Sequence, residues 1–340
     1  MRLLVTGAAG FIGMHSCLRL LERGHEVFGI DNLNAYYDPA LKRARLEQLR
    51  PFAKFAFEKL DIADEAALSA AFESRRFDAV LHLAAQAGVR YSLENPMAYV
   101  SSNVAGFLNV LEGCRRSHIA QLCYASSSSV YGANAELPFR EEHRVDSPVS
   151  IYAATKRANE LMAHSYGELY GMACTGLRFF TVYGPWGRPD MALFIFTRAI
   201  LEGRPVRVFN GGDMLRDFTY IDDIVEAVTA IVERPHPGAQ GGLQLPSSPR
   251  SRLFNIGHGS PVKLMDFVRA IERALGKTAL IEPAPMQLGD VRATYASTDK
   301  LRAEIGYAPS TTIETGVGRF VEWYRSYYAS TRISPSGLAA

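Results

Sequence analysis

The sequence lacks the features of a membrane, extracellular or polyanion-binding protein. It has only four cysteines in 340 residues and none form a CxxC pair, so we expect a reduced, cytoplasmic chain without disulfides. No apolar run approaches the roughly 20 residues of a membrane helix, and the strand-like run at residues 2–6 leaves no room for a signal peptide. The net charge of +2 predicts neither a nucleic-acid nor a membrane partner. No spacing of His, Cys or Asp suggests a metal site.

Short apolar runs alternate with helical patterns through the first half of the chain. Phe11, Met14 and Leu18 recur at helical spacing, and Gly24 ends that helix. Short, nearly all-apolar strands separated by helices indicate a parallel sheet covered on both faces, the doubly wound Rossmann architecture of the α/β class. The predicted strands cover residues 3–6, 26–30, 79–84, 122–126 and 175–179.

The second half of the chain is less regular and predicts a smaller α/β substrate domain. Residues 235–249 carry four prolines and three glycines, which is typical of a surface loop. Helices are predicted at residues 264–275 and 313–327, and strands at residues 206–209 and 280–282. We expect a Rossmann domain of residues 1–180 with 212–235, a substrate domain of residues 181–211 with 236–330, and a frayed tail at residues 331–340.

A glycine-rich turn connects the first predicted strand to the first predicted helix. Gly7, Gly10 and Gly13 let the backbone turn sharply and approach a pyrophosphate without obstruction by a Cβ atom. Phe11 and Ile12 begin the helix, whose N-terminus offers free N–H groups and the positive end of the helix dipole. The flanking strand and helix favour a dinucleotide site over the alternative, a tight turn that binds no ligand.

The ends of other strands complete the predicted dinucleotide site. Asp31 ends the second strand, where its carboxylate can accept bonds from the adenosine ribose and repel a 2′-phosphate, so NAD is favoured over NADP. Asp61 either meets the adenine or caps a helix at residues 66–72; the sequence favours neither. The remaining predicted cofactor contacts are Asn32, Ile62, Leu83, Ala84 and Ala85, together with Tyr152 and Lys156.

A tyrosine and a lysine four residues apart form the predicted catalytic pair. Tyr152 and Lys156 share one face of a helix that Ser150 caps. A free tyrosine has a pKa of about 10. We expect the Lys156 ammonium and the nicotinamide of NAD⁺ to lower that pKa, so that Tyr152 takes a proton from a sugar hydroxyl while hydride leaves the same carbon. One of the serines at residues 126–129, which end a strand, would hydrogen-bond the reacting oxygen.

The motifs, in this order, resemble those of the extended short-chain dehydrogenases/reductases, which bind nucleotide sugars and keep NAD throughout the cycle. The resemblance runs from residue 2 to about residue 327, and it also implies a homodimer formed through helices near residues 104–114 and 151–166. Its segments are 6–13, 82–85, 126–132, 152–156, 178–185 and 216–223. Within that family the chain is most similar to the UDP-glucuronate 4-epimerases, through residues 31–46, 86–90 and 187–191.

Three positions separate this resemblance from related activities. UDP-galactose epimerases usually carry Asn where this chain has Thr181, which favours a uronate over a neutral hexose. Sugar 4,6-dehydratases carry an Asp-Glu pair at the positions of Ser128 and Ser129, and UDP-glucuronate decarboxylases carry a Glu at the second of them. The alternatives left open are a UDP-glucose/UDP-galactose 4-epimerase, a related UDP-sugar epimerase or decarboxylase, and a non-catalytic dinucleotide sensor.

The resemblance implies NAD-dependent conversion of UDP-glucuronate to UDP-galacturonate through a transient 4-keto intermediate. Tyr152 would be the base, Ser127 its hydroxyl partner, and Lys156 would also hold the nicotinamide ribose. The sugar then turns about its phosphate linkage and hydride returns to its other face. The hydroxyls expected to hold the sugar carboxylate, and so to prevent loss of CO₂, belong to Ser128, Ser129 and Thr181.

Cationic and aromatic side chains are expected to bind the UDP moiety. Arg216 and Arg292 would anchor the diphosphate, because guanidinium groups bind phosphates strongly. Arg188 would bind or cover the nucleotide. The further predicted contacts are Phe209, stacked on uracil, Val206 in the same strand, and Arg90 near the substrate. For each of these residues the alternative is an ordinary surface cation or core side chain.

Overall fold

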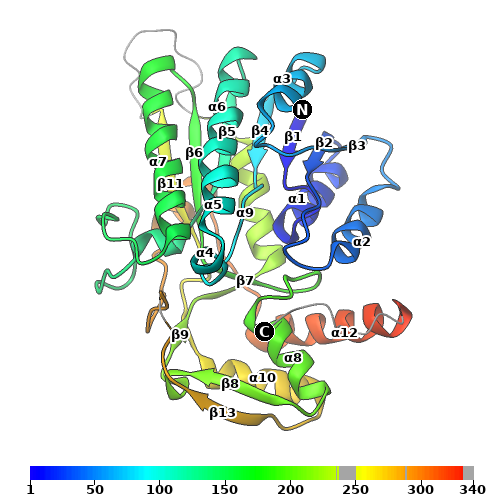
Figure 1. Ribbon diagram of the computed structural model, residues 1–340, viewed down its shortest axis with the longest axis vertical. Coiled ribbons are helices and arrows are strands. Elements are labelled where there is room, and N and C mark those ends of the chain that lie inside the picture. The colour runs from blue at the N-terminus through cyan, green and yellow to red at the C-terminus, as the bar shows by residue number, and fades with distance from the viewer. Residues whose placement is uncertain (235, 237–249, 288, 332–340) are drawn as a thin grey trace.

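The computed structural model of the protein describes residues 1–234, 236, 250–287 and 289–331. Most of the predicted surface loop (residues 235 and 237–249) and all of the predicted tail of residues 331–340 except its first residue lie outside the described residues. The described chain has a larger part, built on a sheet with helices on both faces, and a smaller part beyond one edge of that sheet (Figure 1).

Seven parallel strands form the large sheet, in the order β11-β6-β5-β4-β1-β2-β3. This confirms the predicted doubly wound fold. The strand order reverses between β1 and β4, and ligands of such sheets bind outside the carboxyl ends of the strands at this point. The strands are β1 (Arg2–Thr6), β2 (Glu26–Asp31), β3 (Phe55–Lys59), β4 (Ala79–His82), β5 (Gln121–Ser127), β6 (Cys174–Phe179) and β11 (Ser251–Ile256).

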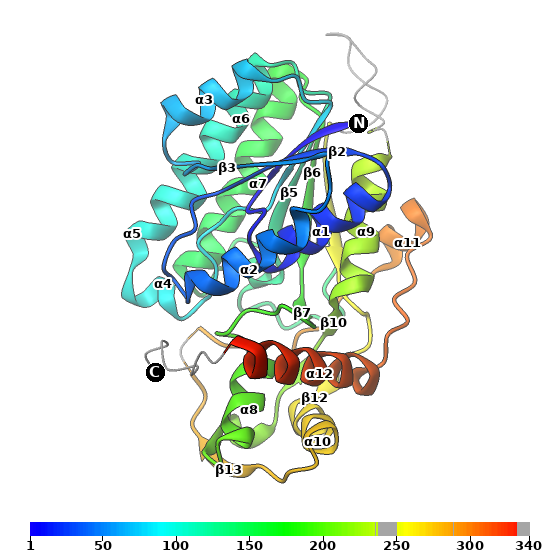
Figure 2. The same ribbon diagram turned by 90° about the vertical axis from the view of Figure 1, so that its right-hand side faces the viewer.

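Successive residues of a strand pack on opposite faces of the sheet. In β1, Leu3 and Val5 belong to the core shared with α1 and α9, whereas Leu4 belongs to the core shared with α3, α6 and α7 (Figure 2). Burial on both faces explains why the central strands read as continuous apolar runs. The helices of the larger part are α1 (Phe11–Glu22), α2 (Pro39–Leu49), α3 (Glu65–Ser74), α6 (Gly106–Arg116), α7 (Ile151–Tyr170) and α9 (Ile221–Glu233).

The smaller part lies beyond the carboxyl edge of the sheet (Figures 1 and 2). The helix predicted at residues 264–275 is confirmed as α10, and the helix predicted at residues 313–327 continues to Thr331. The predicted strands at residues 206–209 and 280–282 are confirmed as a parallel pair, β8 and β13. The elements are α8 (Ala192–Leu201), β8 (Pro205–Phe209), α10 (Leu264–Leu275), β13 (Leu280–Ala284) and α12 (Ile313–Thr331).

The remaining elements are short, and several of them lie between the two parts. Three of the helical ones are not α-helices: η1 is a π-helix, and η2 and η3 are 3₁₀ turns. These elements are α4 (Tyr91–Glu94), α5 (Pro96–Tyr99), η1 (Val100–Ala105), η2 (Ser128–Tyr131), β7 (Thr181–Tyr183), η3 (Asn210–Gly212), β9 (Leu215–Arg216), β10 (Phe218–Tyr220), β12 (Val262–Lys263) and α11 (Asp299–Ile305).

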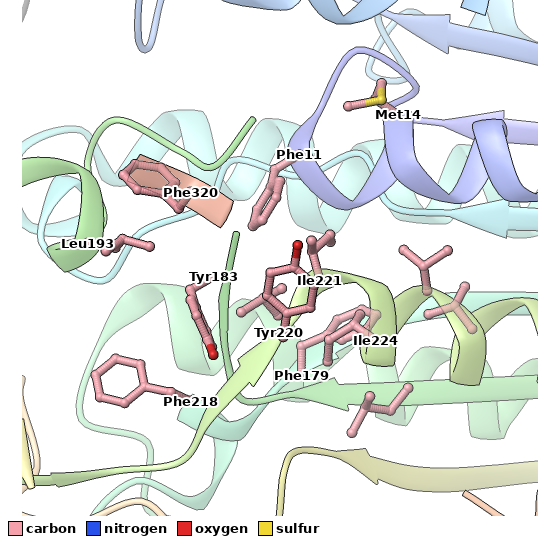
Figure 3. Close-up of a cluster of buried hydrophobic side chains, with 14 of the residues drawn as sticks. Phe11, Met14, Phe179, Tyr183, Leu193, Phe218, Tyr220, Ile221, Ile224 and Phe320 are labelled. Carbon is pink, nitrogen blue, oxygen red and sulfur yellow. The ribbon is translucent and has the colours of Figure 1, made fainter. Parts of the chain in front are cut away.

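Buried side chains from both parts fill the junction between them (Figure 3). Phe11 of α1, Tyr183 of β7 and Phe320 of α12 belong to one hydrophobic core. Phe218 of β10 stacks on Phe267 of α10, with ring centroids 4.0 Å apart. The two parts therefore share a core, and this core fixes the smaller part against the edge at which the strands end.

Two strands of the large sheet were not predicted. The edge strand β3 is half-buried or exposed along its length, so it carries little hydrophobic signal. The other edge strand, β11, pairs with β6 from Ser251 to Ile256. This departs from the predicted domain boundary, which placed residues 236–330 in the substrate domain, because β11 returns to the larger sheet.

Two sequence expectations concern the whole chain. All four cysteines are free and buried, as predicted. Among the described residues, every helix is too short or too polar to cross a membrane.

Candidate active site

The turn between β1 and α1 has no room for a side chain at its glycine positions. A Cβ atom on Gly7, where φ is +73°, would lie 2.7 Å from the backbone nitrogen of Ala84, and one on Gly13 would lie 2.0 Å from the carbonyl oxygen of Gly7. Gly10 is the N-cap of α1 and provides no side-chain cap. The first N–H groups of a helix lack intrahelical acceptors, so they remain free for an anion such as a dinucleotide pyrophosphate.

Asp31 ends β2 at the same edge of the sheet and is buried. Next to it, the side-chain amide of Asn32 donates to the carboxylate of Asp61 at 2.9 Å, so the structure brings these two predicted residues together. Asp61 is not a helix cap, because α3 is capped by Asp64. The capping alternative for Asp61 is therefore wrong, and its carboxylate lies beside Asn32 at the expected adenosine end.

The remaining predicted cofactor contacts lie around this turn. Leu83 and Ala84 follow β4, and their N–H groups donate to the carbonyl and the hydroxyl of Thr6 at 3.1 Å each. Phe11 and Ile62 are buried in the two hydrophobic cores, so only their backbone could contact a ligand. Ile12 and Ala85 are half-buried at the turn and after β4.

The three predicted catalytic side chains come together where β5 meets α7. Ser150 caps α7, as predicted, so Tyr152 and Lys156 lie one turn apart near its N-terminus. The Lys156 ammonium is buried and donates to the carbonyl of Ala125 at 2.9 Å. The Tyr152 hydroxyl hydrogen-bonds with Ser127, at the carboxyl end of β5.

Burial opposes the charge on both members of the catalytic pair. It raises the pKa of Tyr152, although the hydrogen bond with Ser127 and the charge of Arg188 act in the opposite direction. Burial also lowers the pKa of Lys156 to about 8, although the negative charge of Glu160 raises it in part. We expected a lowered pKa for Tyr152 from the sequence. That expectation is for the site with NAD⁺ bound and stays a prediction; in the chain by itself, removal from water outweighs the nearby donors and positive charge.

A buried ion pair behind the catalytic pair was missed by sequence reasoning. Arg178 of β6 donates from Nε and Nη2 to the carboxylate of Glu160, at 2.8 and 3.0 Å, and both side chains are fully buried. The hydroxyl of Ser126 donates to the same carboxylate at 2.7 Å. Glu160 follows Lys156 by one helical turn, so its charge favours the ammonium. The resemblance included Arg178, but nothing in the sequence paired it with Glu160.

The predicted carboxylate-binding hydroxyls lie at the ends of β5 and β6. Ser129 donates its backbone N–H to the Ser127 hydroxyl at 3.1 Å, and the Ser127 hydroxyl donates to the Ser129 hydroxyl at the same distance. Ser128 begins the η2 turn and is half-buried. Thr181 begins β7 and is also half-buried, with its backbone N–H bound to the carbonyl of Asp217 at 3.1 Å. The hydroxyls of Ser128, Ser129 and Thr181 thus lie beside the strand ends and remain partly exposed.

Arg188 lies close enough to Tyr152 for its charge to lower the tyrosine pKa. Its Nε donates to Asp190 at 3.1 Å, and the hydroxyl of Tyr36 donates to the same carboxylate at 3.1 Å. Burial alone would raise the pKa of Asp190, but Arg188 and Tyr36 lower it further than burial raises it. Sequence reasoning missed Tyr36 and Asp190, although both lie in the segments most similar to UDP-glucuronate 4-epimerases.

The two predicted diphosphate anchors are neighbours in the smaller part. Arg216 donates from Nη1 to the carbonyl of Arg292 at 3.1 Å and from Nη2 to the carboxylate of Asp290 at 2.6 Å. The side chain of Arg292 is 71% exposed and pairs with Asp213. Both guanidinium groups are therefore held by carboxylates beside the region where a nucleotide is expected.

The predicted nucleotide-binding strand contributes one ring and one core residue. The guanidinium of Arg90 lies over the ring of Phe209, 5.1 Å from its centroid, so two predicted contacts from distant parts of the chain meet. Val206 departs from its predicted role, because its side chain is 1% exposed and packs in the core. Side chains alternate between the two faces of a strand, so Val206 and Phe209, three residues apart in β8, point to opposite faces and do not line one site together.

Comparison with known proteins gives the family. Residues 3–257 match the model of the NAD dependent epimerase/dehydratase family. The chain belongs to this family. Over 96% of its length it is 48% identical to the probable UDP-glucuronate 4-epimerase of Rhizobium meliloti, of which it covers 98%.

Two solved structures of this family are similar along almost the whole chain. One is UDP-glucuronic acid 4-epimerase from Bacillus cereus in complex with UDP-glucuronic acid and NAD, with a TM-score of 0.88, 31% identity, and coverage of 96% of this chain and 100% of that one. The other is Thermus thermophilus UDP-glucose 4-epimerase in complex with NAD, with a TM-score of 0.82, 32% identity, and coverage of 96% and 99%.

The pKa of Lys156 predicts a pH-dependent contribution to stability. Its ordinary value of 10.5 falls to about 8 in the folded chain. Between these values the unfolded lysine binds more protons than the folded one, so the free energy of unfolding rises with pH. We expect the wild type to gain on the order of 3 kcal/mol relative to Lys156→Met between pH 8 and 10.5, measured by urea unfolding without added NAD.

The exposed Lys59 is the matched control. Lys59→Met should follow the wild type across the same pH range. A constant stability difference between wild type and Lys156→Met would contradict the buried, proton-releasing lysine.

Proposed function

We propose that this protein is an NAD-dependent UDP-glucuronate 4-epimerase, which inverts C4 of UDP-glucuronate to give UDP-galacturonate. The observation that carries this proposal is the half-buried Tyr152, hydrogen-bonded with Ser127 and one helical turn from Lys156, with the cation of Arg188 nearby. A relative named as a probable UDP-glucuronate 4-epimerase and a structural neighbour that binds UDP-glucuronic acid and NAD support the same substrate and cofactor.

NAD would accept a hydride from C4 of the sugar and return it to the resulting ketone. The residues of the turn fit this cofactor: Gly7, Gly10 and Gly13 leave the helix N-terminus open to the pyrophosphate. Asp31 would bind the adenosine ribose, and Asp61 with Asn32 would border the adenine. Lys156 would bind the nicotinamide ribose through the ammonium protons that its bond to Ala125 leaves free.

The protein side chains manage the proton and the carboxylate. Tyr152 takes the proton of the C4 hydroxyl, and Ser127 donates a hydrogen bond at the same oxygen. A 4-keto uronic acid is a β-keto acid, which loses CO₂ readily when its carboxylate can rotate freely. The side chains proposed to hold this carboxylate are Ser128, Ser129 and Thr181.

The smaller part of the molecule is proposed to anchor UDP while the sugar turns. Arg216 and Arg292 would bind the diphosphate, and Phe209 and Arg90, which already stack together, would border the uracil. In this proposal the larger part, now including β11, holds the cofactor, and the smaller part holds the nucleotide. The four buried, free cysteines support a reducing, cytoplasmic location.

The proposal is tested by nuclear magnetic resonance of UDP-glucuronate incubated with purified protein and no added NAD. We expect conversion to UDP-galacturonate, and loss of at least about 1000-fold in rate for Tyr152→Phe, because the general base is removed. Tyr170→Phe is the matched control, since Tyr170 is an exposed tyrosine at the other end of α7. Turnover of UDP-glucose with no turnover of UDP-glucuronate would instead establish the neutral-sugar epimerase.

A homodimer through α6 and α7 is part of the proposal. Leu108 of α6 is 40% exposed and Leu161 of α7 is 51% exposed, and apolar side chains on neighbouring helices favour burial against a second copy. Leu161→Glu should convert a dimer to a monomer in sedimentation velocity. The control Leu280→Glu, at an exposed leucine on β13, should leave the dimer intact. A monomeric wild type would refute this interface.

A further inference from the structure

Arg45 of α2 is a buried cation whose hydrogen-bond acceptors, among the described residues, are uncharged oxygen atoms. Its side chain is 0% exposed, and within the described residues all its hydrogen bonds go to backbone carbonyls and to the Tyr37 hydroxyl. Its guanidinium also lies over the ring of Tyr37, 5.4 Å from the centroid. Burying a cation without an ionic partner costs folding free energy unless its donors are satisfied. The positions of these acceptors therefore show which segments Arg45 joins.

The acceptors belong to two segments that are distant in the sequence. Nη1 donates to the carbonyl of Ala9 at 3.1 Å, inside the glycine-rich turn. Nε and Nη2 donate to the carbonyl of Trp186 at 3.1 and 2.7 Å, and Nη2 also donates to Gly187 at 3.2 Å. Gly187 directly precedes Arg188. One side chain thus joins the proposed pyrophosphate turn to the segment that carries Arg188.

Other contacts fix the segment of residues 185–187 in the same place. A ring nitrogen of His15, on α1, donates to the carbonyl of Pro185 at 3.0 Å. Burial lowers the pKa of His15 to about 4, so this ring is neutral near neutral pH. Trp186, with φ of +63°, packs against Trp323 and Tyr327 of α12, at centroid distances of 5.3 and 5.2 Å. The segment is held between α1, α2 and α12, so a shift of the turn displaces it.

We propose that Arg45 is a positioning residue that couples binding of the dinucleotide to binding of the UDP-sugar. A pyrophosphate on the turn fixes the carbonyl of Ala9, which orients the Arg45 guanidinium and so fixes the backbone before Arg188. The identity of the two ligands rests on the proposed function; the coupling rests on the hydrogen bonds of Arg45. By linkage, each ligand then raises the affinity for the other by the same factor.

The test compares UDP binding to protein loaded with NAD and to protein stripped of it, by isothermal titration calorimetry. In the wild type we expect NAD to raise the affinity for UDP about tenfold. In Arg45→Gln we expect this ratio to fall close to one, because glutamine cannot bridge the two segments. Arg45→Lys keeps the charge with fewer and less rigid donors, so its ratio should be intermediate.

Arg43→Gln is the matched control, because Arg43 is exposed on the same helix. It should keep the wild-type ratio. The proposal would be overturned if NAD did not change the affinity of the wild type for UDP. It would also be overturned if Arg45→Gln kept the wild-type affinity ratio, even with a lowered melting temperature. Should Arg45→Gln not fold, Arg45→Lys takes its place, and an unchanged ratio there contradicts the coupling. Failure of NAD-loaded wild type to bind UDP would instead defeat the proposed function.

Discussion

Burial of ionisable side chains at the carboxyl edge of the parallel sheet is the constraint on which the candidate active site depends. It raises the pKa of Tyr152 and lowers that of Lys156, and so opposes the charged form that each needs. The chain offsets this with nearby charges: Glu160, on the same helix, acts on Lys156, and Arg188, from the segment after β7, acts on Tyr152. Each compensating charge is itself paired, with Arg178 or with Asp190. Truncating one partner of such a pair leaves an uncompensated buried charge, which is costly.

The topology of the sheet places these groups within reach of one another. Parallel strands all end at one edge, so the glycine turn after β1, Asp31 at the end of β2 and Ser127 at the end of β5 face the same space. The hydrophobic core continues past this edge into the smaller part. This shared core holds the segments that carry Arg188 and Arg216 against the edge of the sheet. The site is therefore built between two parts that cannot separate without exposing a shared core.

The sequence predicted the parts whose signals are local. The glycine turn and the helix of Tyr152 and Lys156 were found because their spacing lies within flanking strand and helix patterns that are themselves local. The end of an apolar strand pointed to one of the serines at residues 126–129, and the resemblance selected Ser127. The ion pair of Glu160 with Arg178 and the contacts of Arg45 were not predicted, since their partners meet only after folding. The raised pKa of Tyr152 in the chain without cofactor was not predicted for a related reason, because depth of burial cannot be read from a four-residue spacing.

Ionisation of Tyr152 is the central claim of the account, and ultraviolet absorbance of the phenolate measures it directly. The difference between the titrations of wild type and Tyr152→Phe isolates this one hydroxyl. Because burial raises its pKa in the chain alone, we predict that loading with NAD⁺ moves the difference titration below the ordinary tyrosine pKa of about 10. A difference titration that stays above that value with NAD⁺ bound would contradict Tyr152 as the base.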